Sequence, residues 1–418
     1  MAWKTKIPYR LIDFSARTQL SENYVIGVKR ISDSGGAGTW VRIDENDNIV
    51  EVEDNYFSNH PTYQFSEVTI EDNDFIEIPK FYIKSDGNTR FWISPEEKEG
   101  FKCHPAFMSN GNEIDSIYIG KYQGYMYENK MYSVGENIFL PLEDGETDRE
   151  KIKPTVYITF EQARKACEAW NSVSETGAVQ VTGFHMLNIH EVSACQWLAL
   201  IEKATTNAAM EVPAGYGIGR LYGTGLHNVD DGDTSMVDNI AGEKTSGADF
   251  HGIIGLWGNI WEFIDGIKVN SSNKLLIWDN DGRKVWKQTD VNVPYKKTAN
   301  EIWSPGVTCG YYKNRLLTAG YLYDTADLFL PDFTTLTPYY ENGSFSDGIY
   351  GRIRSNFECK VAIGGGYDTG DFGGLYSYRF DIQQPATSEN SEGVVSDYGD
   401  NASDIGTRLC FASVNLNI

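Results

Sequence analysis

Residues 251–266 read HGIIGLWGNIWEFIDG. Trp257 and Trp261 place two large apolar side chains where they can anchor loops that have no hydrogen-bonded ladder of their own. Asn259 carries an amide that can bond loop backbone, and Glu262 needs a paired donor if it is buried. The stretch therefore predicts a structural core segment.

Two segments upstream have the spacing of helices. Residues 159–171 read TFEQARKACEAWN, in which Thr159 suits an N-cap and Gln162 completes a capping box. Residues 189–203 read IHEVSACQWLALIEK and predict a second helix. Apolar side chains fall on one face of each: Phe160, Ala163, Ala166, Cys167 and Trp170 in the first, and Val192, Cys195, Leu198 and Ala199 in the second. We expect both cysteines to be buried core thiols.

The rest of the chain alternates short β-type runs with turns, so the predicted fold class is α+β with two helices, short strands and long loops. Residues 1–100 are expected to form a small β-rich N-terminal domain. Residues 101–418 form the second predicted domain, with insertions near 268–300 and 310–350. Within the first insertion, KLLIWDNDGRKVWKQ predicts a hairpin with its turn at residues 280–282.

Composition excludes several classes of protein. The formal net charge of -23 repels phosphate backbones and anionic lipids, so we expect neither nucleic-acid nor membrane binding. Six cysteines without a CxxC pair argue against a zinc ribbon and indicate reduced thiols made in a cytosol. The N-terminus lacks the apolar region of a signal peptide, and no apolar run is long enough to span a bilayer.

Motifs of common enzymes are missing from the sequence. HExxH, GxSxG, the P-loop and the dinucleotide fingerprint are all absent, so no catalytic residue is predicted. The Asp-rich turns at 230–233 and 278–281 carry the oxygen ligands that Ca²⁺ prefers. Because such turns are far commoner than calcium sites, no cofactor is predicted, and a calcium-dependent glycan-binding lectin stays an alternative.

Three segments, taken in order, resemble the formylglycine-generating-enzyme family. They are the two helical segments, then GLWGNIWEF within 251–266, then AIGGGYDTGDFGG (362–374) with NASDIGTRLCFA (401–412). The resemblance covers roughly residues 110–415 and implies a C-type-lectin-like fold. It assigns a structural scaffold role to Trp257, Gly258, Asn259, Trp261, Glu262, Gly364, Gly365, Gly366, Gly406 and Arg408.

The chain departs from these enzymes at their active site. The resemblance places Thr369 and Gly374 where the enzymes carry a redox-active cysteine pair, and no cysteine lies between Cys359 and Cys410. Without a thiolate there is no sulfur nucleophile or copper-thiolate chemistry. We therefore expect a protein that is not an enzyme, and a formylglycine-generating-type oxidoreductase stays the alternative.

A second resemblance points to a function. Residues 60–85 and 104–126 resemble segments of phage and prophage tail proteins, some of which are variable proteins of diversity-generating retroelements, similar to the major tropism determinant. This implies a homotrimeric receptor-binding protein of the virion tail, made in the host cytoplasm. It would contact other tail proteins through its N-terminal region and bind a bacterial surface protein or glycan.

The expected binding surface is GGGYDTGDFGGLYSYRFD (364–381), which is rich in Gly, Tyr and small polar residues. Residues 364–382 contain no Lys, Glu, Gln, Met or Trp, as adenine-directed mutagenesis of Asn-type codons would require; residues 383–400 do contain Gln and Glu. The predicted exposed contacts are Tyr367, Asp368, Thr369, Gly370, Asp371, Phe372, Leu375, Tyr376, Ser377 and Tyr378, with Asp397 and Tyr398 lining the same surface. The expected frame is Gly364–Gly366 on one side and residues 405–408 on the other.

Overall fold

The computed structural model describes residues 24–32, 39–87, 89–135, 154–171, 182–206, 248–293, 310–313, 317–319, 328–331, 337–338, 348–351, 358–365, 374–383 and 405–412. Strands dominate these residues, and α-helices are few: α1 (Tyr56–Asn59), α2 (Phe160–Glu168) and α3 (Ile189–Lys203). Two 3₁₀ helices, η1 (Pro61–Tyr63) and η2 (Pro105–Phe107), are also present. The described part of the chain is thus a mixed α+β structure with little helix.

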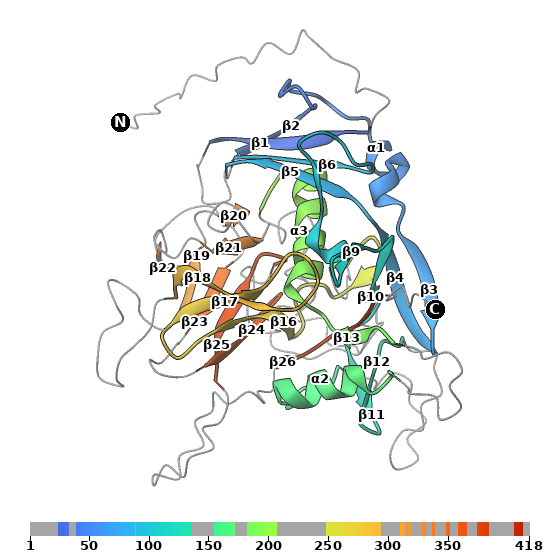
Figure 1. Cartoon of the computed structure of the whole chain (residues 1–418), viewed down its shortest axis with the longest axis vertical. Coiled ribbons are helices and arrows are strands. Elements are labelled where there is room, and N and C mark those ends of the chain that lie inside the picture. Colours follow the sequence, from blue (N-terminus) through green and yellow to red (C-terminus); the bar gives the residue numbers. More distant parts are fainter. Residues whose placement is uncertain are drawn as a thin grey trace, which may run out of the picture.

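Three sheets carry most of the strands (Figure 1). The first has the order β2-β1-β6-β5-β7, with bounds Thr39–Ile43, Ile26–Ser32, Arg90–Ser94, Tyr82–Asp86 and Lys102–Cys103. The second has the order β13-β27-β10-β4-β3, with bounds Phe184–Met186, Leu409–Phe411, Ser116–Gly120, Asn73–Pro79 and Ser66–Ile70. The third contains residues 261–266, the end of the stretch 251–266.

This third sheet has the order β18-β17-β16-β24-β25-β23-β19-β22, and β26 pairs with β16 beside it. Its bounds are Trp286–Asn292, Lys274–Trp278, Trp261–Val269, Cys359–Ile363, Tyr378–Gln383, Gly348–Gly351, Gly310–Lys313 and Thr337–Pro338, with β26 at Ile405–Gly406. The hairpin predicted at 274–288 is confirmed, because β17 pairs antiparallel with β18. Its Gly282 has a φ of +74°, which suits the turn.

Four two-stranded ribbons complete the described strands. They are β8 (Met108–Ser109) with β9 (Asn112–Glu113), β11 (Tyr125–Tyr127) with β12 (Lys130–Tyr132), β14 (Asp249–Phe250) with β15 (Ile253–Ile254), and β20 (Leu317–Ala319) with β21 (Phe329–Pro331). Such short ribbons have little stability alone. They therefore depend on packing against the larger sheets.

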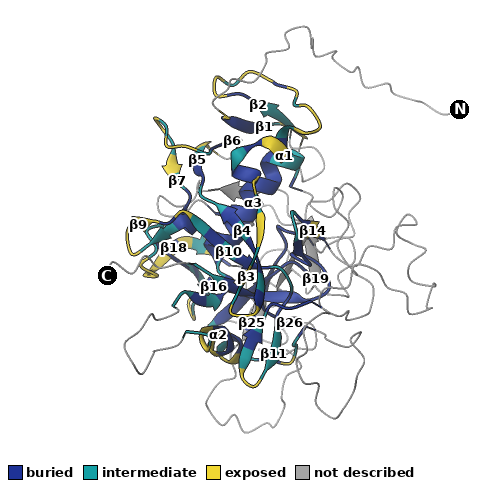
Figure 2. Cartoon of the chain, turned by 90° about the vertical axis from the view of Figure 1, so that its right-hand side faces the viewer, coloured by how far each residue is buried: buried dark blue, intermediate teal, exposed yellow. Residues whose placement is uncertain are grey.

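Helix α3 is the centre of the packing. It lies between the first sheet, where it meets β1 and β6, and β16 of the third sheet (Figure 1). Residues 189–201 are all buried (Figure 2). The helix is therefore buried on every side, and the apolar stripe expected from the sequence is only one of these sides. Asn188 accepts from the backbone of its first turn and Glu191 closes the capping box, which fixes where the helix starts.

Helix α2 also begins as predicted. Thr159 and Gln162 form the reciprocal capping box, and Cys167 is fully buried on the apolar face. The helix ends at Glu168, so residues 169–171 of the predicted segment lie beyond it.

One buried cluster joins the first hundred residues to the rest of the chain. It includes Ile26 of β1, Phe91 of β6, Trp197 of α3 and Phe329 of β21. In the second sheet β4 pairs with β10, which again links strands on both sides of residue 100. The predicted domain boundary at residue 100 stays a prediction, and both the sheet and the core continue across it.

Two His-Pro dipeptides cap 3₁₀ helices in the same way, a relation that the sequence analysis missed. Nδ1 of His60 accepts from the backbone N–H of Thr62, and Nδ1 of His104 accepts from that of Ala106. The other ring nitrogen of His60 lies 2.8 Å from the carbonyl oxygen of Tyr24. Since that oxygen only accepts, Nε2 of His60 carries the proton and the ring is neutral.

This arrangement predicts a pH dependence of stability. Burial lowers the pKa of His60 to about 4, below its unfolded value of about 6.5. Between these two pH values the unfolded state binds a proton at His60 that the folded state does not bind. The contribution of His60 to the free energy of unfolding is therefore complete above pH 6.5 and is lost as the pH falls towards 4. We expect His60 to account for about 2 kcal/mol of lost unfolding free energy between pH 7 and pH 5.

Urea titrations of the wild type and of His60→Asn at both pH values test this. Asn keeps an acceptor for the cap but does not titrate. The pH dependence should be weaker in the variant by about 2 kcal/mol. An equal dependence in both proteins would show that His60 is not held neutral.

Candidate functional site

A buried ion pair holds together the segments that the sequence assigned to the scaffold. Arg408 donates to both carboxylate oxygens of Glu262, Nε to Oε2 at 3.0 Å and Nη2 to Oε1 at 2.7 Å. Arg408 is fully buried and Glu262 nearly so. The donor that Glu262 required is therefore a bidentate guanidinium, the geometry that stabilises a buried carboxylate best.

The remaining donors of Arg408 bind backbone carbonyls of two other segments. Nη1 donates to the oxygen of Gly120 at 2.8 Å, and Nη2 lies 3.0 and 2.9 Å from the oxygens of Ile254 and Gly255. These segments belong to β10 and to the loop after β15. One side chain thus fixes three parts of the chain that lie far apart in the sequence.

Gln123 extends this network, and no motif in the sequence indicated it. Its Nε2 donates to Glu262 Oε1 at 3.1 Å and to the oxygen of Gly255 at 3.0 Å. Its Oε1 accepts from Nδ2 of Asn259 at 2.7 Å. Asn259 has a φ of +63°, a left-handed conformation that Asn tolerates better than most residues. The Nδ2 group of Asn259 therefore bonds a side chain, and the expected bond from Asn259 to loop backbone stays a prediction.

The glycines of the predicted frame permit close backbone approach. A Cβ at Gly364, which has a φ of +92°, would lie 3.2 Å from the oxygen of Leu256 and 3.3 Å from Cα of Trp257. The N–H of Gly258 donates to the oxygen of Gly364 at 2.8 Å. This contact joins WGNIWEF to the strand that leads into the predicted binding segment. Gly366 lies outside the described residues.

Residues 367–372 of the predicted binding surface lie outside the described residues, as do Asp397 and Tyr398. The ends of the first segment are described and are fastened to each other. The N–H of Gly364 donates to the oxygen of Ser377 at 3.2 Å, and the N–H of Gly374 donates to Oγ of Ser377 at 3.0 Å. The described residues on either side of 366–373 therefore lie next to each other.

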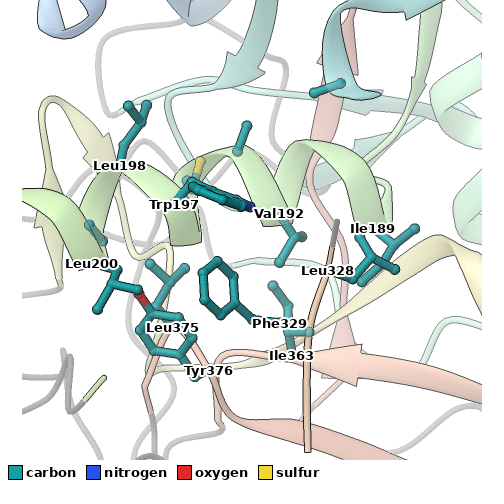
Figure 3. Packing of buried hydrophobic residues seen from close by; sticks show 14 of the residues in the cluster. Ile189, Val192, Trp197, Leu198, Leu200, Leu328, Phe329, Ile363, Leu375 and Tyr376 are labelled. Carbon is teal, nitrogen blue, oxygen red and sulfur yellow. The ribbon is translucent and has the colours of Figure 1, made fainter. Parts of the chain in front are cut away.

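The other four predicted contacts are not exposed, and this part of the prediction is wrong. All four are at most 1% exposed: Leu375, Tyr376, Ser377 and Tyr378. Leu375 and Tyr376 lie beneath α3, where the ring of Tyr376 meets that of Phe329 edge-on at 5.7 Å (Figure 3). A Tyr-rich composition suits a core as well as a binding surface, because a tyrosine hydroxyl can be satisfied inside the protein.

Internal hydrogen bonds satisfy both hydroxyls. Tyr376 donates to the backbone oxygen of Gln196 at 2.7 Å, and Tyr378 donates to the oxygen of Phe329 at 2.7 Å. The side chain of Gln196 donates to the hydroxyl of Tyr378 at 3.2 Å and to the oxygen of Leu375 at 2.9 Å. Residues 374–378 are thus part of the core and hold the C-terminal end of the predicted binding segment. Their side chains are not available as contacts, and we call these residues the anchor.

The described cysteines form no reactive centre. None of the five forms a disulfide with another described cysteine, and burial raises the pKa of the Cys167, Cys195 and Cys410 thiols. A protonated buried thiol is a poor nucleophile. Cys309 lies outside the described residues.

Neither Asp-rich turn supplies a metal site in the described residues. Residues 230–233 lie outside them, and the described part of the chain has no group of three His, Cys, Asp or Glu side chains that could hold an ion. Asp279 and Asp281 of the other turn are described, and burial together with Asp281 raises the pKa of Asp279. Their carboxylates alone are too few to form the oxygen shell of Ca²⁺.

Comparison with known proteins leaves the site without an assigned relative. No family model matches the chain, and a search of curated proteins finds no significant match. Within the described residues, no helix has both the length and the apolar character needed to cross a membrane. The function is therefore argued from the residues and their geometry.

Proposed function

We propose that the chain is a receptor-binding protein of a phage or prophage tail, which binds a bacterial surface protein or glycan. The binding surface is formed by residues 366–373 with the end of segment 384–404, carried on a C-type-lectin-like framework. The protein acts as a homotrimer whose N-terminal region contacts other tail proteins. Its resemblance to tail proteins supplies the biological setting.

One observation supports the location of the surface. Four paired residues, Tyr378, Ile363, Glu262 and Gly406, form a row across β25, β24, β16 and β26. Residues 366–373 connect β24 to β25 at this row, and segment 384–404 rejoins the chain at Ile405, one residue before Gly406. Both segments therefore join the third sheet at the same end of its neighbouring strands, which we call the binding edge.

The framework at this edge is well suited to carry adaptable contacts. Glu262 in this row is paired with the buried Arg408, and Tyr378 at the end of the row belongs to the buried residues 375–378. Loops on a rigid support commonly carry recognition, because the support lowers the entropy lost on binding. Tyr, Asp and Phe at 367–372 offer contact area and hydrogen bonds at low entropic cost.

Replacing residues 367–372 by Gly and Ser at constant length tests the proposal. We expect the variant to lose binding to bacterial cells that the wild-type protein labels, because side-chain contacts are removed. Its melting temperature should stay within about 2 °C, since surface changes away from packing usually alter stability little. Binding is measured with fluorescently labelled protein on a panel of bacterial strains.

A control changes a polar turn elsewhere. Glu45 and Asn46 are exposed in the turn that follows β2, and their replacement by Gly and Ser should leave cell binding intact. Unchanged binding by the 367–372 variant would overturn the proposed location. Failure of the wild-type protein to label any strain in the panel would count against the receptor-binding function.

A further inference from the structure

The hairpin of β17 and β18 carries an exposed run that is both apolar and cationic. Residues 284–287 read KVWK, and all four are exposed. Val285 is 47% exposed and Trp286 is 37% exposed, so two neighbouring apolar side chains lie in water between two lysines. Single exposed apolar side chains are common on any protein, whereas adjacent ones with charged neighbours are typical of an interaction surface.

The ring of Trp286 is held in place within its own chain. Its centre lies 5.9 Å from that of Trp278 on the paired strand, and Nζ of Lys268 lies 4.7 Å from it. Lys268 is fixed in turn, because its Nζ donates to Glu358 at 3.0 Å. An ordered side chain loses little conformational entropy on binding, and tryptophan is enriched among the residues that dominate interface affinity. Trp286 is therefore suited to be the central contact of an interface.

The charge of the chain indicates which partner fits this run. The whole chain has a net charge of -23, whereas residues 284–287 contain two lysines and no acid. Complementary charges bring two surfaces together and select the partner. The rest of the chain is predominantly acidic, so a second copy of the same chain offers the opposite charge.

One exposed run of the described residues has the matching composition. Besides Val285 and Trp286, the large apolar side chains that are exposed there are Tyr24, Ile31, Ile49 and Tyr157. Only Ile49 lies in a run with several acids and no cation, because residues 49–54 read IVEVED. Ile49, Glu51 and Glu53 are exposed and Val50 is buried, as expected for an extended run that presents alternate side chains.

Backbone contacts order this acidic run at both ends. Ile49 bridges Ile43 at the end of β2, and the N–H of Tyr56 in α1 donates to the oxygen of Glu53 at 2.9 Å. In both views β2 and α1 lie at the same end of the molecule, and β18 lies well away from them (Figures 1 and 2). The two runs therefore cannot meet within one copy, but they can meet between copies.

We propose that residues 284–287 of one copy bind residues 49–54 of the next copy, with Trp286 against Ile49 and the lysines facing the acids. A contact between two different surfaces runs head to tail, and it closes into a ring when the rotation between copies allows. Three such contacts give the homotrimer proposed above. The inference rests on that part of the proposed function and uses no residue of the binding edge.

Sedimentation velocity of the full chain between about 1 and 100 µM tests the contact, since this range covers interfaces of moderate affinity. We expect the wild type to form a trimer. Trp286→Ser should raise the midpoint concentration of association by about tenfold or more, because an interface tryptophan carries much of the affinity. Lys284→Glu combined with Lys287→Glu should raise it by a similar factor, because like charges then face each other.

Matched controls change equally exposed residues elsewhere. Tyr157→Ser removes an aromatic side chain that is 67% exposed. Lys102→Glu combined with Lys165→Glu makes the same change of net charge at two other exposed lysines. Both controls should associate as the wild type does, and circular dichroism establishes that every variant is folded.

Reversing the charges on both sides decides whether these two runs meet. Glu51→Lys combined with Glu53→Lys should weaken association as the lysine reversals do. The chain with all four substitutions should regain most of the lost association, because opposite charges face each other again. If it did not, the two runs would contact other partners, and the proposal would be overturned.

The remaining outcomes separate the contact from the function. A trimer that the lysine reversals and Trp286→Ser leave unchanged would overturn the contact and leave the homotrimer in place. A wild type that stays monomeric over the whole range would overturn both. Labelling of bacterial cells tests receptor binding independently of either result.

Discussion

Replacing Arg408 by methionine is expected to lower the free energy of unfolding by about 3–5 kcal/mol, because the change leaves the Glu262 carboxylate buried without its cation. Methionine fills much of the volume of the arginine stem but donates no hydrogen bonds. The carbonyls of Gly120, Ile254 and Gly255 lose a donor at the same time. Urea unfolding followed by tryptophan fluorescence measures the loss.

Two companion variants isolate the cause. Adding Glu262→Gln to Arg408→Met removes the unpaired charge, so the double variant should recover part of the lost stability. Arg283→Met breaks the exposed pair between Arg283 and Asp281, which should cost much less stability. If Arg408→Met cost no more than Arg283→Met, the buried pair would not be what holds the three segments together.

The sequence predicted the local elements well, because their signals lie within a few residues of each other. Thr159 and Gln162 mark the start of α2 by a reciprocal bond three residues apart. The turn at 280–282 likewise marks the hairpin of β17 and β18. The core role of Trp257, Trp261 and Glu262 followed from their size and charge, and all three are buried.

The parts that could not be predicted depend on contacts between distant residues. Gln123 meets Glu262 across 139 positions of sequence, and nothing in its neighbourhood distinguishes it from a surface glutamine. The complete burial of α3 follows from having sheets on two sides, which the periodicity of the helix alone does not reveal. A pocket at the start of α3 could not be predicted either, because Asn188 at the helix start and Gly282 in the hairpin turn line it together only in the folded chain.

Residues 375–378 show the limit of arguments from composition. The run from Gly364 to Asp381 looks uniform in composition, yet the four consecutive side chains at 375–378 are buried. Residues 375–377 precede β25, so their burial does not follow from alternation along a strand, and the hydroxyl of Tyr376 donates to α3 at Gln196. Only the contacts with α3 show that Tyr376 and Tyr378 are core residues and not receptor contacts.

Tyr378→Ala is therefore expected to lower the free energy of unfolding by about 3–5 kcal/mol through the cavity it leaves in the core. The oxygen of Phe329 also loses its donor, which adds about 1–3 kcal/mol when that oxygen is left unsatisfied. Tyr378→Phe separates the two contributions, because it keeps the ring and should cost only the second amount. Urea unfolding of both variants gives the values.

Tyr367→Ala is the matched control, since Tyr367 lies in the segment that we propose to contact the receptor. It should reduce cell binding and leave the unfolding free energy within about 0.5 kcal/mol of the wild type. Tyr378→Ala should lower the unfolding free energy and leave cell binding intact at temperatures where the variant is folded. Where part of it is unfolded, binding should fall only in proportion to the unfolded fraction. If Tyr378→Ala abolished binding while remaining as stable as the wild type, Tyr378 would be a contact residue after all, and the division of the segment at Gly374 would be wrong.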